Sequence, residues 1–591
     1  MTQEKEIGGI WYRLNVYNQE AVVIKSKGEE YSGDIVIPSS FFHEGITYFV
    51  TQIADSAFEL CLKVNSITIP SSIKKTGDNS FYYFGSEYCV YLESIESFCK
   101  IDFGFNGNPL HYAKHVFVNN KQIIHLSIPG TIRKVSERVF KCCNFESITI
   151  EEGVIEIAED AFGGSSIKSI SLPDTLEIIG NSAFENCCEL RCVTIPENTL
   201  TIGDSAFSRC KGLVSVTGGE KVRYIGNNAF SSCNILETFE IKDSLEEIGN
   251  EAFAYCECLS MEIPPKLRSL GAWAFRHSRL SIRIPETLIE ISKYAFAECK
   301  FDGSINVDPN NPKYDSREGC NAVIETQTDT LIRGSEETII PKSVKVIGEY
   351  SFSDLHYLPS IVIPEGVVRI EDNAFKNCYR LRAIDIPSTI VSIGSAFTNC
   401  CNINVQINNL ETWCNIEFGC NPLSMGRWYD GYVGHLKTSD LYVNGEHIID
   451  LVIPSTITSV KKSAFQGCYL KSAKIPHTVT SIGEWAFFGC SYITSILIPK
   501  QVLDIGSGAF AGCENLAFVT ILGNPRIHNG AFAGCEGLKD VYCYSDEAPI
   551  ANEVFGKLNL SKLTLHVPSE AVNNFKETEP WSKFGLIVSL K

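Results

Sequence analysis

The chain has 591 residues, a length at which one compact core no longer grows, so it forms either several domains or a repeat array. Hydrophobic residues make up 44% and charged residues 20%, as in folded soluble proteins, and no run of about 20 apolar residues predicts membrane insertion. The formal net charge of −19 repels phosphates, which argues against nucleic acid as a partner.

Residues 1–50 lack the repeat that follows and carry strand-like runs at 11–14, 21–24 and 35–37. Such a segment can cover the exposed edge of a first coil, so we expect a strand-rich N-terminal cap. Residues 1–6 contain neither a basic nor an apolar stretch and do not resemble a signal peptide. A cell-surface or secreted location therefore requires that a leader has been removed, and the alternative is a cytoplasmic location.

A repeat of 21 to 23 residues begins next and is marked by a phenylalanine column, usually in the dipeptide Ala-Phe. In one unit Leu190, Val193 and Ile195 alternate with polar residues before Pro196, which predicts one short parallel strand per coil. A glycine four residues before the phenylalanine predicts a tight bend. The stretch around the phenylalanine, residues 205–210 in this unit, predicts a single helical or 3₁₀ turn. The column has 18 positions: Phe58, Phe81, Phe140, Phe162, Phe184, Phe207, Phe230, Phe253, Phe275, Phe296, Phe352, Phe375, Phe397, Phe465, Phe487, Phe510, Phe532 and Phe555.

These units resemble the BspA-like, or Treponema pallidum-type, leucine-rich-repeat proteins, as in Ile67-Thr68-Ile69-Pro70 and Ser205-Ala206-Phe207-Ser208-Arg209-Cys210. Units at 216–219 and 239–242 depart from the pattern because they lack the proline. The resemblance implies a leucine-rich-repeat solenoid, α/β to mainly β, with about 18 coils, a parallel β-sheet and a role in surface adhesion and binding. The Ile-x-Ile-Pro stretch or a close variant recurs in phase with the phenylalanine column at Pro70, Pro129, Pro264, Pro285, Pro364, Pro387, Pro454, Pro476 and Pro499.

The phenylalanine column is interrupted three times. Residues 99–110 resemble residues 414–423, and each stretch leads into a predicted hairpin, the second with Asn444-Gly445 suited to a type I′ turn. The other interruption is also hairpin-like. We therefore expect a cap at 1–50, repeats at 51–98, 126–300, 338–402 and 451–560, hairpin insertions at 99–125, 301–337 and 403–450, and a C-terminal cap at 561–591 with a last strand at 563–567 and a helix at 571–581.

Cysteines form a second column. The chain has 24, and in 13 of the 18 units a cysteine lies three residues after the phenylalanine. Residues of one column stack about 4.8 Å apart with parallel side chains, whereas a disulfide needs side chains that converge. We expect buried free thiols, with occasional disulfides as the alternative, and no spacing resembles a zinc site.

Other patterns that resemble reactive or metal-binding motifs have structural explanations. His111 and His115 have the spacing of two ligands on one helix face, but the glutamate of a metalloprotease motif is missing. Residues 308–315 are rich in oxygen ligands but match no calcium loop and have the composition of a turn. Gly506-Ser507-Gly508 is the nearest match to the Gly-x-Ser-x-Gly sequence of a nucleophile elbow, but it falls on the glycine column of the repeat. We predict no enzyme activity, catalytic residue, metal or cofactor.

An aromatic run in the 403–450 insertion is the main candidate for partner recognition. Arg427, Trp428, Tyr429 and Tyr432 are candidate contacts, because these residue types are enriched at binding hot spots, although the run could instead pack the insertion against the solenoid. We expect a non-enzymatic protein of bacterial or protist surface adhesion that binds a protein or glycan, and the alternative is an intracellular protein-interaction scaffold. Outward strand positions are a second candidate surface: Thr68, Thr149, Thr194, Glu240, Glu262, Arg283, Asp385 and Lys474.

Overall fold

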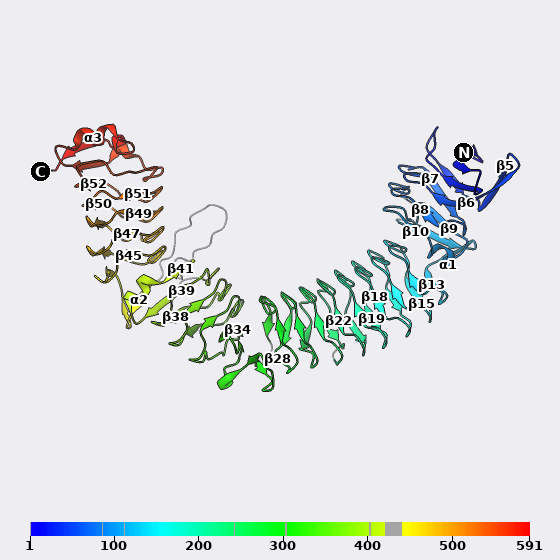
Figure 1. Cartoon of the computed structure of the whole chain (residues 1–591), viewed down its shortest axis with the longest axis horizontal. Coiled ribbons are helices and arrows are strands. Elements are labelled where there is room, and N and C mark those ends of the chain that lie inside the picture. Colours follow the sequence, from blue (N-terminus) through cyan, green and yellow to red (C-terminus); the bar gives the residue numbers. More distant parts are fainter. Residues whose placement is uncertain are drawn as a thin grey trace. The chain divides into compact units, whose positions relative to one another are not determined.

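The structure is a computed structural model, which describes residues 2–85, 87–111, 113–241, 243–301, 304–400, 403–419 and 440–590. The chain divides into two compact units: unit 1 comprises Met1–Gly303 and Asp308–Pro312, and unit 2 comprises Ser304–Val307 and Lys313–Lys591. Within each unit the strands follow one another as the rungs of a solenoid (Figure 1). The predicted solenoid with a parallel sheet is confirmed.

The Ile-x-Ile-Pro stretches form a parallel sheet in each unit, which we call sheet 1. Alternation is as predicted: in β19 (Cys192–Ile195), Val193 and Ile195 are buried and Thr194 is exposed. In unit 1 sheet 1 comprises β4 (Gly33–Val36), β7 (Val64–Ile69), β9 (Cys89–Leu92), β11 (His115–Val118), β12 (Lys121–Ile123), β13 (His125–Ile128), β15 (Ser147–Ile150), β17 (Ser169–Ser171), β19, β21 (Ser215–Gly218), β23 (Thr238–Phe239), β25 (Ser260–Glu262), β27 (Arg279–Ser281), β28 (Arg283–Ile284) and β30 (Lys300–Phe301).

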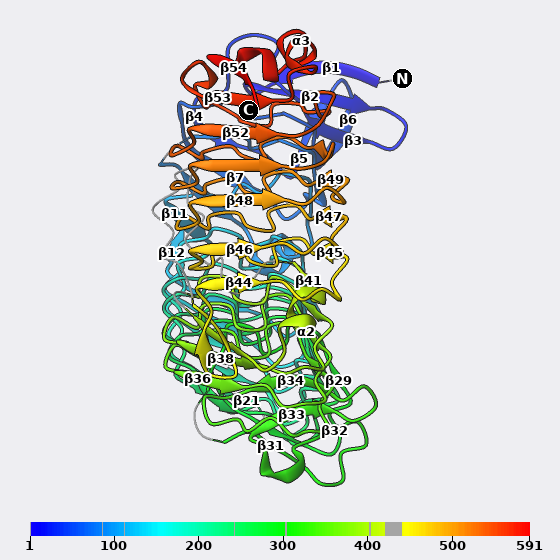
Figure 2. The same cartoon turned by 90° about the vertical axis from the view of Figure 1, so that its left-hand side faces the viewer.

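In unit 2 the sheet-1 strands lie one above another (Figure 2). They are β36 (Ser360–Val362), β38 (Ala383–Ile386), β40 (Asn404–Ile407), β42 (Leu441–Val443), β43 (Glu446–His447), β44 (Asp450–Val452), β46 (Ser472–Lys474), β48 (Ser495–Ile498), β50 (Phe518–Ile521), β52 (Asp540–Cys543), β53 (Thr564–Val567) and β54 (Leu586–Ser589).

A second parallel sheet, sheet 2, lies directly before the glycine column, so the prediction of one strand per coil is wrong. Ile202 of β20 (Thr201–Ile202) is buried and pairs with the equivalent isoleucines of both neighbouring coils. In unit 1 the two-residue strands are β8 (Lys75–Thr76), β10 (Asp102–Phe103), β14 (Lys134–Val135), β16 (Glu156–Ile157), β18 (Ile178–Ile179), β20, β22 (Tyr224–Ile225), β24 (Glu247–Ile248), β26 (Ser269–Leu270) and β29 (Glu290–Ile291). In unit 2 they are β35 (Val346–Ile347), β37 (Arg369–Ile370), β39 (Ser392–Ile393), β41 (Glu417–Phe418), β45 (Ser459–Val460), β47 (Ser481–Ile482), β49 (Asp504–Ile505) and β51 (Arg526–Ile527).

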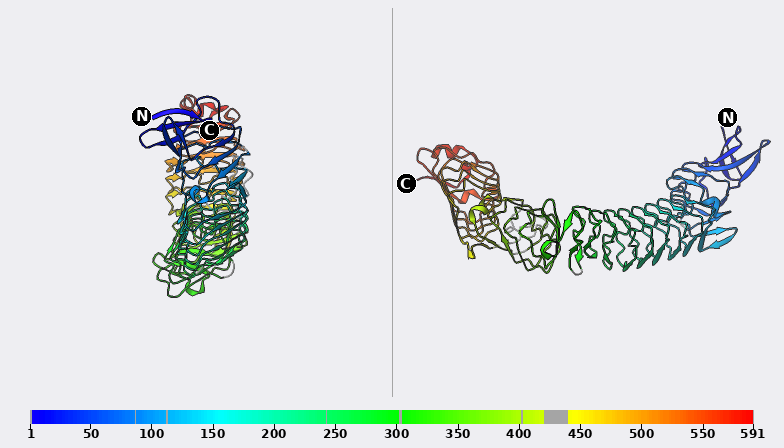
Figure 3. Two further views of the ribbon diagram at one scale, coloured as in Figure 1. Left: turned by 90° about the vertical axis from the view of Figure 1, so that its right-hand side faces the viewer. Right: turned by 60° about the horizontal axis from the view of Figure 1, so that its bottom comes forward.

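The segments around the phenylalanine column form β-turns, not the predicted helical or 3₁₀ turn. In the coil of Phe184, the N–H groups of Glu185 and Cys187 donate to carbonyls three residues back. Ser182 and Asn186 have φ of 51° and 61°, and this left-handed backbone excludes a helix. The N–H groups of Ser182, Phe184 and Asn186 donate instead to carbonyls of the following coil at 2.7 to 2.8 Å. These stacked segments form a third hydrogen-bonded face, which we call the turn ribbon, and coils of unit 1 are seen in succession in Figure 3.

The glycine column has a different cause from the predicted tight bend. Gly203 does not have a positive φ, but a Cβ there would lie 2.6 Å from Oδ1 and 2.7 Å from the backbone N of Asn181 on the preceding coil. The N–H of Asp204 donates to that Oδ1 at 2.9 Å, which draws the two coils together. Glycine is therefore required because two backbones approach closely.

The phenylalanine and cysteine columns fill the core. The rings of Phe184 and Phe207 stack with centroids 5.1 Å apart and an interplanar angle of 13°. The thiol of Cys210 is buried and donates to the carbonyl oxygen of Phe184 at 3.1 Å. Burial raises the pKa of the Cys210 thiol well above its usual value, so the thiol stays protonated. The predicted burial of the cysteine column is confirmed.

The two similar insertions continue the solenoid. In the first, α1 (Ile95–Phe98) lies between β9 and β10, and β10 and β11 extend sheet 2 and sheet 1 in parallel. In the second, α2 (Leu410–Asn415) and β41 repeat this order, and β42 pairs in parallel with β40. Each ends in the predicted antiparallel hairpin, β11–β12 and β42–β43. The insertions add coils that lack the column phenylalanine, so the solenoid exceeds the predicted 18 coils.

Each unit begins with an antiparallel cap on sheet 2. In unit 1, β1 (Thr2–Ile7), β2 (Ile10–Asn15) and β3 (Glu20–Val23) form a meander that joins β6 (Ile46–Ile53), which also pairs with β5 (Ser40–His43). In unit 2, β32 (Tyr314–Asp315), β33 (Ala322–Glu325) and β34 (Thr330–Gly334) form a similar meander, preceded by β31 (Asn306–Val307) and interrupted by η1 (Arg317–Gly319). The 301–337 interruption, predicted to be hairpin-like, contains the antiparallel pair of β33 and β34, which caps the second unit.

The C-terminal cap contains the predicted strand β53 and a helix shorter than predicted, α3 (Val572–Glu577), with the 3₁₀ turns η3 (Leu560–Lys562) and η4 (Trp581–Lys583). Strand β54 then pairs in parallel with β53, so the prediction that 563–567 is the last strand is wrong. The buried Trp581 lies against the last column phenylalanine, Phe555, with centroids 5.9 Å apart.

Candidate functional site

The candidate contacts predicted from the sequence, Arg427, Trp428, Tyr429 and Tyr432, lie outside the described residues. The insertion that carries them is described on both sides, up to β41 and from β42 onward. Its hairpin turn, Asn444-Gly445, has φ of 51° and 82°, which agrees with the predicted type I′ turn. The candidate site is therefore built from the strands that surround this hairpin in unit 2.

A row of side chains crosses sheet 1 at the insertion. The register aligns Val362, Asp385, Gln406 and Tyr442 on β36, β38, β40 and β42. Val362 and Asp385 are exposed and Gln406 and Tyr442 are half-buried, and each follows a buried residue, so the row faces outward. Val362 is 64% exposed although it is apolar. Asp385, one of the predicted outward positions, lies in the middle of this row.

A groove of about 490 Å³ follows this row along the ends of the strands. Carboxylates and amides dominate its polar lining, and the hairpin turn closes one side. Glu365 accepts hydrogen bonds from the backbone N–H of Ser388 at 3.1 Å and from the amide of Asn408 at 3.0 Å. These bonds, chiefly those from Ser388, hold the pKa of Glu365 below its usual value, so the carboxylate remains charged. The lining residues include Val362, Glu365, Asp385, Gln406, Asn408 and Asn444.

Four rings that we call the aromatic stack continue the row beyond the hairpin: Tyr442, His447, Tyr469 and Tyr492. Successive centroids are 5.0, 5.9 and 4.3 Å apart. His447 also pairs with Asp440, Nε2 to Oδ1 at 3.1 Å, which fixes the ring in the stack. Tyr492 is 44% exposed. The stack therefore offers a partly exposed aromatic surface directly beside the groove.

The similar insertion in unit 1 places an aromatic ring at the equivalent hairpin position. Phe117 on β11 stacks on Tyr91 of β9 with centroids 4.7 Å apart and an interplanar angle of 15°. Across this hairpin the side chains of Gln122 and His115 form a hydrogen bond of 2.9 Å. The pair of His447 and Asp440 occupies the equivalent positions in unit 2. Both insertions thus present a ring on the outward face of sheet 1.

The other predicted outward positions also face solvent: Thr68 is half-buried, and Thr149, Thr194, Glu240, Glu262, Arg283 and Lys474 are exposed. The structure does not bring them together with the groove, apart from Asp385. The sequence did not identify the aromatic stack. The sequence feature that could have indicated the stack is the position of Tyr469 and Tyr492, which follow their column phenylalanines by four and five residues, where the chain turns into sheet 1.

The structure also locates the weaker candidates. His111 lies in a turn and His115 begins β11, so the two do not share a helix face. Asp308 accepts the N–H of Asn310 at 2.9 Å, as expected of a turn. Among the residues that the structure describes, no group of three or more His, Cys, Asp or Glu side chains could hold a metal ion. No helix within the described ranges is both long and apolar enough to cross a membrane.

Coils with a longer strand, a two-residue strand and a turn segment, stacked around apolar columns, define the class of leucine-rich-repeat solenoids. A family model described as "BspA type Leucine rich repeat region" matches in six copies, over residues 41–108, 111–237, 224–317, 334–421 and 439–564. The chain belongs to this family, which confirms the resemblance seen in the sequence.

Three solved structures illustrate the likeness. A leucine-rich repeat protein from Bacteroides ovatus is 20% identical over 91% of this chain and 94% of that chain, with a TM-score of 0.27. The pneumococcal vaccine antigen PcpA is 16% identical over 100% and 99%, with a TM-score of 0.27. The Treponema pallidum leucine-rich repeat protein is 22% identical over 40% and 91%, with a TM-score of 0.23. No curated protein matches the chain.

Proposed function

We propose that this protein is a non-enzymatic binding protein that recognises a protein or glycan at the second insertion of unit 2. One observation carries the proposal: the outward row of sheet 1 lines a groove and leads directly into the aromatic stack at Tyr442. Exposed aromatic rings beside fixed polar groups are typical of recognition surfaces. Arg427, Trp428, Tyr429 and Tyr432 belong to the same insertion, and we propose that they contact the same partner.

The chemistry of the groove favours a neutral or cationic partner. Glu365 and Asp385 are carboxylates, and Gln406, Asn408 and Asn444 offer amides that both donate and accept hydrogen bonds. Sugar hydroxyls and peptide groups match such a lining. A polyanion would be repelled by these carboxylates and by the net charge of −19.

We further propose a cell-surface or secreted location and a role in adhesion, on the ground of membership in the BspA-type family. One observation supports the alternative, an intracellular protein-interaction scaffold. Cys188, Cys192 and Cys258 are exposed free thiols, and exposed thiols persist more readily in a reducing compartment. The two locations predict different partners.

The test compares the wild-type chain with a variant carrying Tyr442→Ser, Tyr469→Ser and Tyr492→Ser. Labelled protein is titrated on intact cell surfaces, immobilised matrix proteins, a glycan array and immobilised cytosolic proteins. We expect saturable binding that the variant weakens by at least about ten-fold, because each aromatic hot spot contributes more than about 1 kcal/mol. Binding to cytosolic proteins alone would favour the intracellular scaffold.

Two further variants separate recognition from packing. Tyr17→Ser removes an aromatic that is 85% exposed in unit 1, and it should leave binding unchanged. Replacing Trp428, Tyr429 and Tyr432 by serine should abolish binding without lowering the melting temperature. A fall in melting temperature instead would show that the aromatic run 428–432 packs the insertion against the solenoid. Full binding by the variant with serines at 442, 469 and 492 would overturn the proposed site.

A further inference from the structure

The turn ribbon has a direction, because within each uninterrupted run a coil donates hydrogen bonds to the coil that follows. The donors are the N–H groups two residues before, at, and two residues after the column phenylalanine. In the coil of Phe510 these are Gly508, Phe510 and Gly512, and they donate to Asn529, Ala531 and Ala533 at 3.0, 2.8 and 2.8 Å. A ribbon therefore starts with free carbonyl groups and ends with free N–H groups, unless something covers them.

The chain covers the carbonyl end wherever an interrupted ribbon starts again. The amide of Asn108 donates to the carbonyl of Val139 at 2.8 Å, just before Phe140. The N–H of Gly334 donates to Ser351, and the buried guanidinium of Arg333 donates to the carbonyl of Ser353 at 3.0 Å. The indole of Trp413 donates to the carbonyl of Ala464 at 2.9 Å, just before Phe465. Each restart is thus supplied with a donor.

The last coil ends the ribbon without such a cover. By the register its donors are Glu553, Phe555 and Lys557, and none of these three N–H groups has a hydrogen-bond partner within the described part of the chain. The cap instead extends sheet 1 through β53 and β54 and fills the core beneath Phe555. The indole of Trp581 donates to the carbonyl of Pro549, at 2.9 Å, and not to the ribbon.

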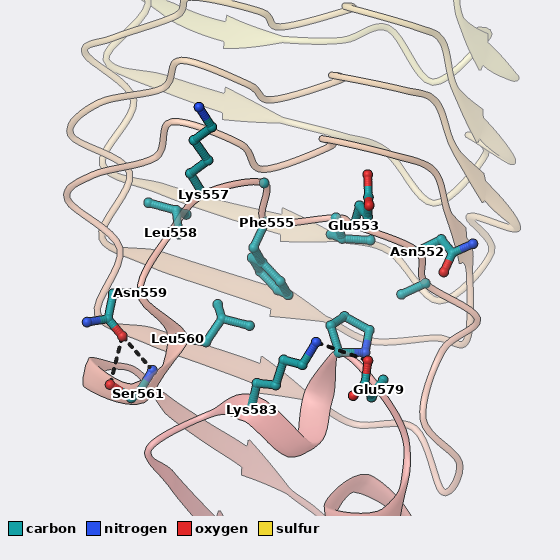
Figure 4. A pocket seen from close by; sticks show the side chains of 14 residues that line it. Asn552, Glu553, Phe555, Lys557, Leu558, Asn559, Leu560, Ser561, Glu579 and Lys583 are labelled. Atoms are coloured by element: carbon teal, nitrogen blue, oxygen red, sulfur yellow. Dashed lines mark hydrogen bonds and ion pairs between the residues drawn. The ribbon is translucent and has the colours of Figure 1, made fainter.

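The residues that carry these donors line a hollow of about 910 Å³ between the last coil and the cap (Figure 4). On the cap side the ion pair of Lys583 and Glu579, Nζ to Oε2 at 3.0 Å, borders the hollow, and the side chains of Glu553 and Lys557 lie along the opposite rim. The lining carries lysine and glutamate side chains in equal number, so their charges cancel and create no strong electrostatic field that would attract a simple anion. Its distinctive feature is the row of backbone N–H groups at alternate residues.

We propose that this hollow binds a polypeptide segment of a partner protein, which continues the turn ribbon by one rung. The occupant is defined by coils such as those of Phe184, Phe207 and Phe510, where the equivalent donors bind alternate carbonyls of the next peptide segment. Addition of backbone to an open hydrogen-bonding edge is an established mode of peptide recognition. The site lies apart from the groove and aromatic stack, so it stands or falls independently of the proposed function.

The first experiment measures amide hydrogen exchange in the full-length protein by mass spectrometry. The probe is a synthetic peptide of residues 526–540 with Cys535→Ser, because this sequence covers the equivalent donors of the Phe510 coil, two coils earlier. Without peptide, residues 552–558 should exchange much faster than residues 507–513. At about 1 mM peptide, residues 552–558 should be protected, whereas a scrambled peptide should not protect them. Slow exchange without peptide, or no protection with it, would overturn the proposal.

A matched pair of variants tests the backbone donor directly. Lys557→Pro removes one N–H at a residue whose φ is not positive, and Lys557→Ala removes only the side chain. Lys557→Pro should weaken binding of the fluorescent peptide about two- to ten-fold relative to Lys557→Ala, the effect of one hydrogen bond. Melting temperatures of both variants check folding. Equal peptide affinity of the two folded variants would contradict the proposal, and the exchange result stands even if Lys557→Pro misfolds.

Discussion

The cysteine column allows a sharp test of what holds neighbouring coils together. The thiol of Cys210 is fully buried and donates to the carbonyl of Phe184 at 3.1 Å. At two places in the same column the residue is serine, and Ser165 and Ser278 donate to the equivalent carbonyls at 2.8 and 2.6 Å. The column therefore selects a small side chain that donates a hydrogen bond, and we expect Cys210→Ser to be tolerated better than Cys210→Ala.

The expected magnitudes follow from the contacts. Cys210→Ala removes a buried sulfur and one hydrogen bond, which should cost about 1 to 2 kcal/mol of local stability. The carbonyl of Phe184 keeps the N–H of Cys187 as a donor, so the loss stops short of a fully unpaired carbonyl. Cys210→Ser retains the donor and should cost less than about 1 kcal/mol. If the column needed only an apolar filler, the order would reverse, because a buried hydroxyl without a partner costs about 1 to 3 kcal/mol.

The assay must report on one coil, because the stability of a repeat array is a sum of local and neighbour contributions. Native-state hydrogen exchange provides this through the opening free energy of residues 180–210. The amide of Phe184, bonded to the carbonyl of Ala206 at 2.8 Å, is a suitable probe. A lower opening free energy in the serine variant than in the alanine variant would refute the hydrogen-bonding role of the column.

Three further predictions concern the same columns. Gly203→Ala should lower the opening free energy in the same exchange assay by about 1 to 3 kcal/mol, because its Cβ would lie 2.6 Å from Oδ1 of Asn181. Gly28→Ala should be neutral, because no atom lies within 4 Å of that Cβ. Equal effects of the two substitutions would contradict the close-approach explanation. Burial raises the pKa of Cys256 to about 12, so this thiol should contribute stability that is constant below about pH 8.5, where the unfolded thiol ionises, and that falls as pH rises toward 12. The melting temperature should therefore drop between about pH 9 and 11, less steeply in Cys256→Ser, and a flat profile would be incompatible with buried thiols. A thiol reagent should modify the exposed Cys188 in the native protein but reach Cys210 only after unfolding, which peptide mapping can check; early modification of Cys210 would refute its burial.

Much of the fold could be predicted because the core positions recur in the sequence with the period of the repeat. The alternation of Val193 and Ile195 with polar neighbours, ended by Pro196, was sufficient to predict sheet 1. Sheet 2 was missed because a two-residue strand such as Thr201–Ile202 is too short to show a period. The helical turn was predicted wrongly because sequence does not reveal the left-handed backbone of Ser182, which only the hydrogen bonds to the next coil stabilise.

The candidate site was predictable only in part. The two similar insertions and their hairpins were found from their sequences, because Asn444-Gly445 determines the turn locally. The aromatic stack was not, because it joins Tyr442 and His447 to Tyr469 and Tyr492 on later coils, and which coils touch depends on register. Long-range register follows from how many residues each coil contains, and the insertions change that number.

The central claim is that the surface around Tyr442 contacts a partner, and site-specific photo-crosslinking tests it most directly. A benzophenone amino acid replaces Tyr442 in one protein and Tyr17 in a control, and both are irradiated on intact cells and in cytosolic lysate. We expect a saturable crosslink at position 442, competed by unlabelled wild-type protein but not by the variant with serines at 442, 469 and 492. Equal crosslinking at positions 442 and 17, or competition by that variant, would contradict the account.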